Sequence, residues 1–342
     1  MKEALVYDSL PGKDVRCRLC GHNCLIKNGH RGICAVRENT DGRLYSLVYG
    51  KVISLNVDPI EKKPLFHFLP GSTSFSIATV GCNFRCKHCQ NYEISQYPRE
   101  RKFEIPGKDM SPEQVVQQAI QYGCESISYT YTEPTIFFEF AYDCAQLAQE
   151  KGLKNVFVSN GYTGPDAVRL IAPYLDANNI DLKGSDTFYR EVCGARLDPV
   201  KETIRLMKES GVWVEVTTLI IPDLNDSEAD LTAIAEFIVT VDPGIPWHVS
   251  QFYPTYKLTD KPRTPVATLR HACEIGYKAG LRHVYEGNVP GEGGENTYCP
   301  SCSHLLIGRY GYAIRENTLR NGRCPVCNTV ISGIWQKEED RK

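Results

Sequence analysis

Cysteine is the residue type whose number and spacing most directly predict chemistry in this chain. The 342 residues include 15 cysteines, and eleven of these fall into three groups with short gaps. Short gaps in a chain without an export signal are typical of metal ligation, because disulfides are rare in a reducing compartment. The other four cysteines are predicted to be small buried hydrophobic residues, although Cys193 stands out because it lies in the polar stretch EVCGARLD.

The central group consists of Cys82, Cys86 and Cys89, with the spacing C-x3-C-x2-C. Structural zinc takes four protein ligands, so three neighbouring thiolates without a fourth are unusual for zinc. Three thiolates suit a four-iron cluster that leaves one iron open to a substrate. His88 adds an aromatic ring on which a flat group such as adenine can rest. The alternative is a zinc knuckle completed by His88 or by a remote residue.

Two groups of four cysteines flank the central one. The first reads C-x2-C-x3-C-x9-C, and the second pairs two C-x2-C knuckles with 21 residues between them. Four thiolates close a tetrahedral zinc site, so we predict structural zinc at both. The alternatives are an auxiliary iron–sulfur cluster or a mixed site using His30 at the first group, and an electron-transfer iron at the second. The predicted ligands are Cys17, Cys20, Cys24, Cys34, Cys299, Cys302, Cys324 and Cys327.

Residues 71–290 are predicted to form the core that positions these groups. Strand-like and helix-like stretches alternate six times, which favours an α/β fold with a parallel sheet and helices outside it. Such a sheet opens out or curls into a partial barrel, and ligands bind at the carboxyl ends of its strands. The predicted strands are 74–79, 126–130, 155–159, 177–182, 212–219 and 248–252, and the predicted helices are 112–122, 137–151, 165–174, 200–210, 227–240 and 265–279.

Two smaller domains are predicted to flank the core. Residues 1–70 hold the first cysteine group, two strand-like runs and a connector rich in proline and lysine. Residues 291–342 hold the last cysteine group and a charged tail, KEEDRK, which is expected to fray. This last domain is too short to bury a self-sufficient core, so metal ligation is expected to supply its folding energy.

Charge and hydropathy restrict the partners and the compartment. The formal net charge is -2, which gives no reason to expect a nucleic-acid partner. No apolar run is long enough to predict a membrane span. The first residues, MKEALVYDSLPGKD, lack the basic and then apolar pattern of a signal peptide, so we expect a cytoplasmic protein.

The central loop, GCNFRCKHCQN, resembles the C-x3-C-x-aromatic-C motif of the radical S-adenosylmethionine (SAM) superfamily. The resemblance implies a partial (β/α)6 TIM-type barrel with cysteine-rich extensions at both ends. It also implies a catalytic [4Fe-4S] cluster on Cys82, Cys86 and Cys89, whose open iron binds the amine and carboxylate of SAM. The reduced cluster then splits SAM to a 5′-deoxyadenosyl radical. An electron donor such as ferredoxin or flavodoxin is implied as a partner.

The stretch SYTYTEPT after the second core strand is similar to the superfamily region that holds the SAM ammonium group. The resemblance implies a backbone edge there, with Thr132 in place of a glycine, and a carboxylate from Glu133. A charged acceptor suits an ammonium group. The alternative is that Glu133 caps the following helix.

The stretches VSNG and DLKG resemble the pyruvate formate-lyase activating enzyme branch of the superfamily. There, the resemblance implies that Asn160 lies near SAM and that Lys183 binds its carboxylate. Asp181 lies two residues before Lys183 and therefore faces the same side of the strand. The alternative is a salt bridge between these two residues that fills the barrel mouth. Tyr256 is expected to stack on adenine.

Nearly the whole chain is similar to the radical SAM member of the AmmeMemoRadiSam system. The matching stretches include PIEKKPLFHFLPG, YTYTEPT, VYEGNVPG and CPVC. The resemblance implies Memo-like and AMMECR-type pathway partners and names no substrate.

Three functions follow from these interpretations. The first is an oxidoreductase that cleaves SAM and takes hydrogen from an unidentified small molecule or peptide. The second is an activase for a glycyl-radical enzyme, and the third is a non-enzymatic zinc-binding adaptor. The extra cysteines lie at the two ends rather than after the central loop, which favours the first over the second. The near-neutral charge and the set of SAM-site motifs argue against the adaptor.

Overall fold

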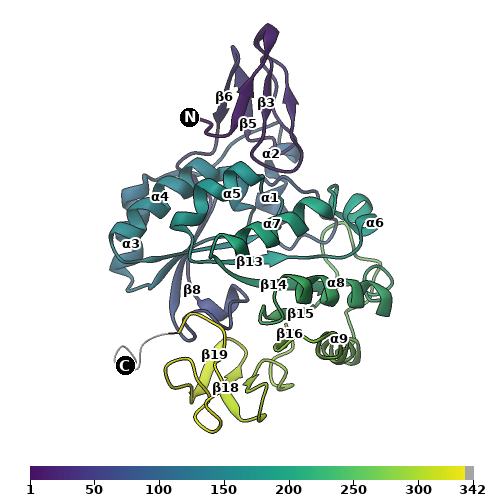
Figure 1. Ribbon diagram of the computed structural model, residues 1–342. Coiled ribbons are helices and arrows are strands. Elements are labelled where there is room, and N and C mark those ends of the chain that lie inside the picture. Colours follow the sequence, from purple (N-terminus) through teal and green to yellow (C-terminus); the bar gives the residue numbers. More distant parts are fainter. Residues whose placement is uncertain (336–342) are drawn as a thin grey trace. The chain divides into compact units, whose positions relative to one another are not determined.

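The computed structural model describes residues 1–335, so the KEEDRK tail lies outside the described residues. The chain divides into two compact units, each assembled from separate stretches of sequence. The first unit contains residues 1–58, 73–178 and 189–212, and the second contains residues 59–72, 179–188 and those from 213 onward. Each unit carries parallel strands with helices between them (Figure 1), which confirms the α/β class.

Buried strands form the centre of the first unit. They are β8 (Ser54–Pro59), β9 (Thr73–Ala78), β11 (Ser126–Tyr129) and β12 (Lys154–Ser159), in the order β8-β9-β11-β12. The last three are parallel, and Ile127 of β11 lies opposite Phe75 on one side and Asn155 on the other. Nearly every residue of β9, β11 and β12 is buried, as is typical of parallel strands covered on both faces.

The helices of the first unit run together along one side of these strands in Figure 1. They are α3 (Pro112–Gln121), α4 (Phe138–Glu150), α5 (Pro165–Ile171) and α7 (Asp198–Glu209). At the start of α3, the Ser111 hydroxyl accepts from Gln114 N (3.3 Å), and the Gln114 side chain accepts from Ser111 N (2.9 Å). This capping box fixes the helix start, with Pro112 at the first helical position.

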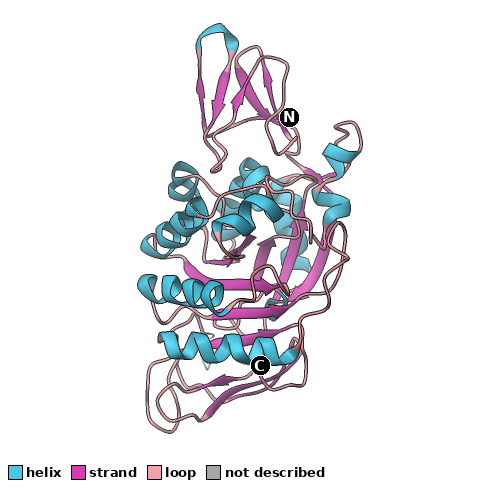
Figure 2. Ribbon diagram, turned by 90° about the vertical axis from the view of Figure 1, so that its right-hand side faces the viewer, coloured by secondary structure: helices cyan, strands magenta, loops and turns pink. Residues whose placement is uncertain are grey.

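Two small antiparallel sheets make up an amino-terminal lobe, which is purple in Figure 1 and appears as magenta hairpins in Figure 2. Their strands are β1 (Lys2–Glu3), β6 (Arg43–Ser46) and β5 (Arg37–Thr40), and β2 (Tyr7–Ser9), β3 (Val15–Cys17) and β4 (Leu25–Ile26). Arg37 joins this lobe to α4, because its guanidinium nitrogens lie 3.1 and 2.5 Å from the Glu139 carboxylate oxygens. Both side chains are at most 2% exposed, so each charge depends on the other.

Parallel strands also form the centre of the second unit. They are β14 (Trp213–Ile220), β15 (Trp247–Gln251) and β16 (Val284–Gly287), with helices α8 (Glu228–Val241) and α9 (Val266–Ala279) between them. Strand β13 (Ala177–Asp181) begins in the first unit and ends in the second. Among the described residues, no helix has both the length and the apolar character needed to cross a membrane.

The connector at residues 59–72 is held inside the second unit by buried polar groups. The Glu215 carboxylate on β14 accepts from Phe66 N (3.0 Å), from His67 N (2.8 Å) and from His248 Nε2 on β15 (2.7 Å). His67 Nε2 lies 2.5 Å from the Tyr285 hydroxyl on β16. These bonds satisfy backbone groups of the connector that would otherwise be buried without partners.

The carboxyl-terminal part of the second unit is a three-stranded antiparallel sheet, yellow in Figure 1. Its strands are β17 (Thr297–Tyr298), β18 (Leu305–Tyr310) and β19 (Ala313–Asn317). Its small buried cluster combines the sulfurs of Cys299 and Cys324 with Leu306, Ile307, Leu319 and Ile331. Two of its six buried members are therefore predicted metal ligands, which leaves few apolar side chains to stabilise it alone.

The predicted strands and helices agree with the structure to within two residues at each boundary, with one exception. Helix α5 ends at Ile171 and continues as a 3-10 turn over Ala172–Tyr174, because Pro173 cannot extend an α-helix. Strand β16 was not predicted, and its four residues, VYEG, are too few to show a period. The division into three domains stays a prediction.

The buried ion pair of the amino-terminal lobe gives a stability prediction. Replacing Glu139 by Gln removes the carboxylate partner of the buried Arg37 charge, and we expect a loss of about 3–5 kcal/mol in the free energy of unfolding. Urea unfolding followed by circular dichroism measures this loss. The matched control is Asp41→Asn in the exposed Lys13–Asp41 pair, which should leave the unfolding midpoint unchanged. Equal effects of the two variants would contradict the role given to Arg37.

Candidate metal and cofactor site

The central cysteine loop, residues 79–91, follows β9 and leads into α1 (Tyr92–Ser95). Gly81 adopts φ 99°, and a Cβ there would lie 2.6 Å from Val36 Cγ1, so glycine is required at this close approach. Phe84 is buried and contacts the rings of Tyr162 (5.1 Å between centroids) and Tyr189 (6.1 Å). The loop is therefore anchored by a glycine contact and an aromatic side chain, while its cysteines stay partly exposed.

The three cysteines of this loop lie within electrostatic range of one another. Burial, the Glu133 carboxylate and the thiols of Cys86 and Cys89 raise the pKa of Cys82 well above its usual value. Phe84 N points at Cys82 Sγ (3.4 Å), and Cys89 Sγ lies 3.2 Å from the Ser95 hydroxyl. The three thiols and the Glu133 carboxylate can all carry negative charge in this region. The three thiols therefore become thiolates together only if a cation neutralises them.

The Glu133 carboxylate and Asn160 meet beside Cys82. Glu133 accepts from Asn160 N (2.7 Å), from the Ser159 hydroxyl (2.8 Å) and from the Thr135 N–H (3.0 Å) and hydroxyl (2.6 Å). It also caps the 3-10 turn Pro134–Phe137, which was the alternative to SAM binding. Burial raises the pKa of Glu133, although these hydrogen bonds oppose the rise.

Asn83 is a site residue that the sequence interpretation missed. Its side-chain oxygen accepts from Asn160 Nδ2 (2.7 Å), which also lies 3.8 Å from Cys82 Sγ. Asn83 Nδ2 is buried and has no hydrogen-bond partner among residues 1–335. A buried amide donor without a partner is costly, so this atom is suited to a bound ligand. The only sequence signal was its place between two predicted ligands.

Thr132 is buried and holds the start of the loop. Its hydroxyl donates to the Thr79 carbonyl (2.8 Å), directly after β9. The preceding residue, Tyr131, adopts φ 60°, and its hydroxyl bonds the Asp58 carboxylate. The structure therefore gives Thr132 a loop contact, and its predicted role at the SAM ammonium stays a prediction.

Cys193 is the scattered cysteine with polar sequence neighbours, and it lies beside the central loop. One ligand atom each of Cys86, His88 and Cys193 lies within 4.8 Å of the others. The backbone fixes this neighbourhood, because Arg85 N donates to the Cys193 carbonyl (2.8 Å). A fourth thiol is thus close to Cys86, which the spacing of the loop did not indicate.

The remaining predicted SAM contacts belong to the second unit. Lys183 Nζ lies 2.6 Å from Asp181 Oδ2, so the two side chains share one face of the strand and form the salt bridge that was the alternative to SAM binding. Asn225 Nδ2 donates to the Lys183 carbonyl (2.6 Å) and fixes the backbone there. Tyr256 adopts φ 51°, and Lys257 Nζ lies 4.7 Å from the centre of its ring. The roles of these residues toward SAM stay predictions.

The amino-terminal group of cysteines meets at one small cavity in the first unit. Cys17, Cys20, Cys24 and Cys34 all line a cavity of about 20 Å³, together with His22 and Arg37. His30 does not line this cavity and instead bonds the Asn28 carbonyl through Nδ1 (2.9 Å). The four predicted cysteines therefore line one cavity, and His30 lies outside it.

Cys17 and Cys34 of this amino-terminal centre are buried, whereas Cys20 and Cys24 are partly exposed. Burial raises the pKa of Cys17 to about 11, although the nearby Arg37 guanidinium and the Leu19 N–H oppose the rise. Burial and the neighbouring thiol of Cys17 raise the pKa of Cys20 as well. A metal ion compensates such a rise by stabilising thiolates directly.

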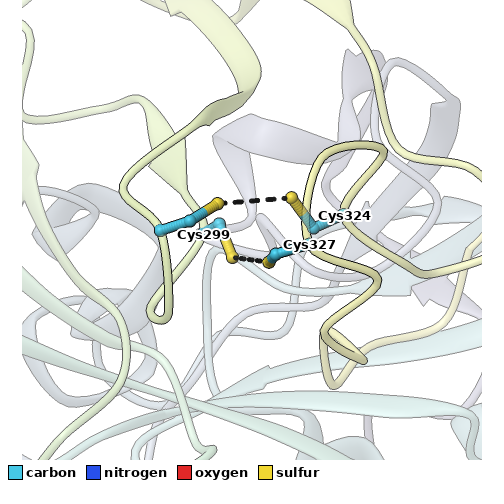
Figure 3. Close-up of side chains that lie close together, drawn as sticks. Cys299, Cys324 and Cys327 are labelled. Atoms are coloured by element: carbon cyan, nitrogen blue, oxygen red, sulfur yellow. Dashed lines mark hydrogen bonds between the residues drawn. The ribbon is translucent and has the colours of Figure 1, made fainter.

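The carboxyl-terminal centre brings its four cysteines closer still. The ligand atoms of Cys299, Cys302, Cys324 and Cys327 all lie within 4.8 Å of one another. Figure 3 shows Cys299 facing Cys327, with 3.5 Å between the sulfurs, and the Cys302 and Cys324 sulfurs are 3.7 Å apart. Zinc–sulfur bonds of about 2.3 Å in a tetrahedron place sulfurs roughly 3.8 Å apart, so these distances fit one metal ion.

The two knuckles of this centre repeat one backbone conformation. Cys299 N donates to the His304 carbonyl and Cys324 N to the Thr329 carbonyl, both at 2.9 Å. The fifth residue of each knuckle has a positive φ, 59° at Ser303 and 62° at Asn328. The Thr329 hydroxyl and N–H lower the pKa of the Cys327 thiol, which favours the thiolate that a metal binds.

Comparisons with known proteins agree with this geometry. Residues 76–238 match the family model of the radical SAM superfamily. Uncharacterized protein MJ0808 of Methanocaldococcus jannaschii is 49% identical over 97% of this chain and 99% of its own length. A putative glycyl-radical enzyme activating enzyme of the same organism, MJ1227, is 27% identical over 54% of this chain and 75% of its own length.

A solved structure shows the same fold. Streptococcus suis SuiB bound to precursor peptide SuiA superimposes with a TM-score of 0.51 at 16% identity. The match covers 68% of this chain and 52% of SuiB. At this identity the likeness concerns the fold alone.

Metal analysis tests the two flanking centres. A variant in which Cys82, Cys86 and Cys89 are all replaced by Ala, purified without oxygen, should hold about two equivalents of zinc per chain. Adding Cys302→Ser should lower this to about one, because a site closed by four thiolates loses its geometry when one is removed. Substantial iron with a four-iron spectrum in the triple variant would instead indicate an auxiliary cluster.

Proposed function

We propose, because the chain belongs to the radical SAM superfamily, that it cleaves SAM reductively and takes hydrogen from an organic substrate. Members of this superfamily are enzymes that use a [4Fe-4S] cluster and SAM. The observation that carries the proposal is the central cysteine loop, with three neighbouring thiols at the carboxyl end of β9. When bound and reduced, the cluster supplies the electron that splits SAM into methionine and a 5′-deoxyadenosyl radical.

The residues around the central cysteine loop fit a [4Fe-4S] cluster. Three thiols, each partly exposed, provide three ligands, and the remaining coordination position is left for SAM. The buried Asn83 amide, which lacks a hydrogen-bond partner among the described residues, adds an N–H donor beside the first ligand. In this proposal Cys82, Cys86 and Cys89 hold the iron atoms, and His88 supplies a ring beside them.

Polar residues of the chain would orient SAM. Glu133 Oε2 accepts only one hydrogen bond among those described, from Asn160 N, so it retains capacity for an ammonium group. Lys183 offers a cation for the methionyl carboxylate, and its ion pair with Asp181 orients it. Thr132 and Asn160 would shape the backbone around this pocket, and Tyr256 would stack on adenine.

The substrate we propose is a small molecule or a peptide. The two extra cysteine centres lie at the ends of the sequence, outside the central loop, and the distances between sulfurs at the carboxyl-terminal centre suit one structural ion. The second candidate is activation of a glycyl-radical enzyme. It is favoured by the similarity to a putative activating enzyme, which extends over 54% of this chain.

We also propose that the chain is the radical SAM member of an AmmeMemoRadiSam system. Support comes from the motifs along nearly the whole sequence, including the connector PIEKKPLFHFLPG and the knuckle CPVC. Memo-like and AMMECR-type proteins would then act in the same pathway, and ferredoxin or flavodoxin would supply electrons.

Anaerobic reconstitution tests the proposed function. The protein is loaded with iron and sulfide, reduced with dithionite and mixed with SAM, and 5′-deoxyadenosine is measured by chromatography. A visible charge-transfer band together with 5′-deoxyadenosine supports either enzyme candidate. Absence of both from a well-folded, iron-loaded protein would leave only the zinc-binding adaptor.

The ligand assignment predicts different outcomes for two neighbouring cysteines. Cys86→Ala should abolish 5′-deoxyadenosine formation, because two thiolates do not retain a four-iron cluster. The matched control is Cys193→Ala, which changes a buried thiol beside Cys86 and should keep the cluster and the product. Loss of the cluster in the Cys193 variant would mean that four thiolates close the site, and full activity of the Cys86 variant would refute the proposal.

The proposed contact between Lys183 and the SAM carboxylate predicts a change in SAM affinity. A hydrogen bond to a charged group contributes about 1.5–3 kcal/mol, so Lys183→Ala should raise the Kd for SAM roughly tenfold to hundredfold while iron content stays constant. Equilibrium binding of radiolabelled SAM measures this. Lys154→Ala, in the exposed pair with Asp176, is the control and should leave the Kd unchanged. If both variants bind SAM equally well, Lys183 does not bind the SAM carboxylate and the proposed contact is wrong.

A further inference from the structure

The amino-terminal centre is joined to the central cysteine loop by a histidine. His22 lies between the ligands Cys20 and Cys24, and its Nε2 donates to the Asn83 carbonyl (2.9 Å). A carbonyl oxygen only accepts, so Nε2 carries the proton. Asn83 follows Cys82 directly, and its side chain bonds Asn160 (2.7 Å). One hydrogen bond therefore links the chain between two ligands of the first centre to the residue beside Cys82.

A single arginine makes a second link between the two groups. Arg99 Nη2 donates to the carbonyls of Ile33 and Cys82, both at 2.6 Å. Its Nη1 donates to the Phe84 carbonyl (2.9 Å). Ile33 precedes the ligand Cys34, so one guanidinium group holds the backbone at a ligand of each centre.

The loop after β12 also contacts the amino-terminal centre. Gly21 N donates to the Tyr162 carbonyl (3.0 Å), and Gly164 N donates to the Leu19 carbonyl (2.8 Å). A Cβ on Gly164 would lie 2.4 Å from the Arg18 carbonyl, so the two backbones are in close contact. This loop carries Asn160, and the amino-terminal centre thus touches both loops that meet at Cys82.

We propose that the amino-terminal centre is a zinc site that positions the cluster-binding loop. One zinc ion on Cys17, Cys20, Cys24 and Cys34 fixes His22, and His22 fixes the backbone at Asn83 and with it the Cys82 sulfur. His22 is therefore a positioning residue, and this inference rests on the function proposed above.

The donor set of this centre suits a zinc ion. Four cysteines line one cavity, and four thiolates are common ligands of structural zinc. Four thiolates carry more negative charge than one zinc ion neutralises, and the buried Arg37 guanidinium beside them offsets part of the excess.

The test compares three histidine variants of the full chain, reconstituted anaerobically with iron and sulfide. His22→Ala removes the bond to Asn83 but keeps all four thiols, whereas His22→Gln keeps an N–H donor of similar reach. His30→Ala alters an exposed histidine of the same segment that bonds only the Asn28 carbonyl. The measurements are zinc and iron per chain, the electron paramagnetic resonance spectrum of the reduced cluster with and without SAM, and the Kd for SAM.

We expect His22→Ala to keep its zinc and iron but to alter the resonance spectrum and raise the Kd for SAM about two- to tenfold, as expected for one lost hydrogen bond. His22→Gln should restore most of both properties, and His30→Ala should match the unaltered protein. A His22→Ala variant with an unaltered spectrum and Kd would overturn the inference. If the unaltered protein binds neither cluster nor SAM, the proposed function itself fails.

A second experiment tests whether zinc in the amino-terminal centre has this positioning role. Cys24→Ser should release one zinc ion and lower cluster loading at least twofold, while Cys302→Ser, in the carboxyl-terminal centre, should release one zinc ion and leave cluster loading unchanged. Equal cluster loading in both variants, or iron instead of zinc in the amino-terminal centre, would overturn the positioning role of zinc.

Discussion

Crowded thiols are the constraint on which this structure depends. Eleven cysteines gather in three groups, and in two of these groups burial and neighbouring thiols raise the pKa of a cysteine. Such sites favour neutral thiols in the absence of metal and thiolates in its presence. The fold is therefore built to be completed by cations, and two of the six buried members of the carboxyl-terminal cluster are themselves predicted ligands.

The parallel strands of the first unit place the thiols of the central loop beside polar side chains. Strands β9, β11 and β12 end at the same edge, and the loops that follow them carry Cys82, Glu133 and Asn160. Neighbouring strands thus bring together residues that are nearly 80 positions apart in the sequence. The amino-terminal lobe closes this arrangement, because Arg37 and His22 reach from it to the core.

The periodicity of apolar residues made the helices predictable, and the spacing of the cysteines made the groups of candidate metal ligands predictable. Apolar patterns of ten or more residues identified the helices, and the gaps between cysteines grouped the ligands of both flanking centres before any geometry was known. Contacts between side chains that are distant in the sequence were not predictable, because no local pattern encodes them. Glu139 pairs with Arg37, Glu215 with His248, and Asn83 with Asn160, each through contacts between distant segments. The proximity of Cys193 to Cys86 has the same origin.

Arg99 holds the central loop through the carbonyl oxygens of Cys82 and Phe84. Every amino acid type offers a carbonyl, so the path of the loop is independent of residue identity at its outward-facing positions. Arg85, Lys87 and Gln90 are exposed there. The side chains at these positions are open to evolutionary drift without displacement of the sulfurs, and the surface beside the cluster ligands is therefore free to adapt to a different redox carrier while the chemistry beneath it stays the same.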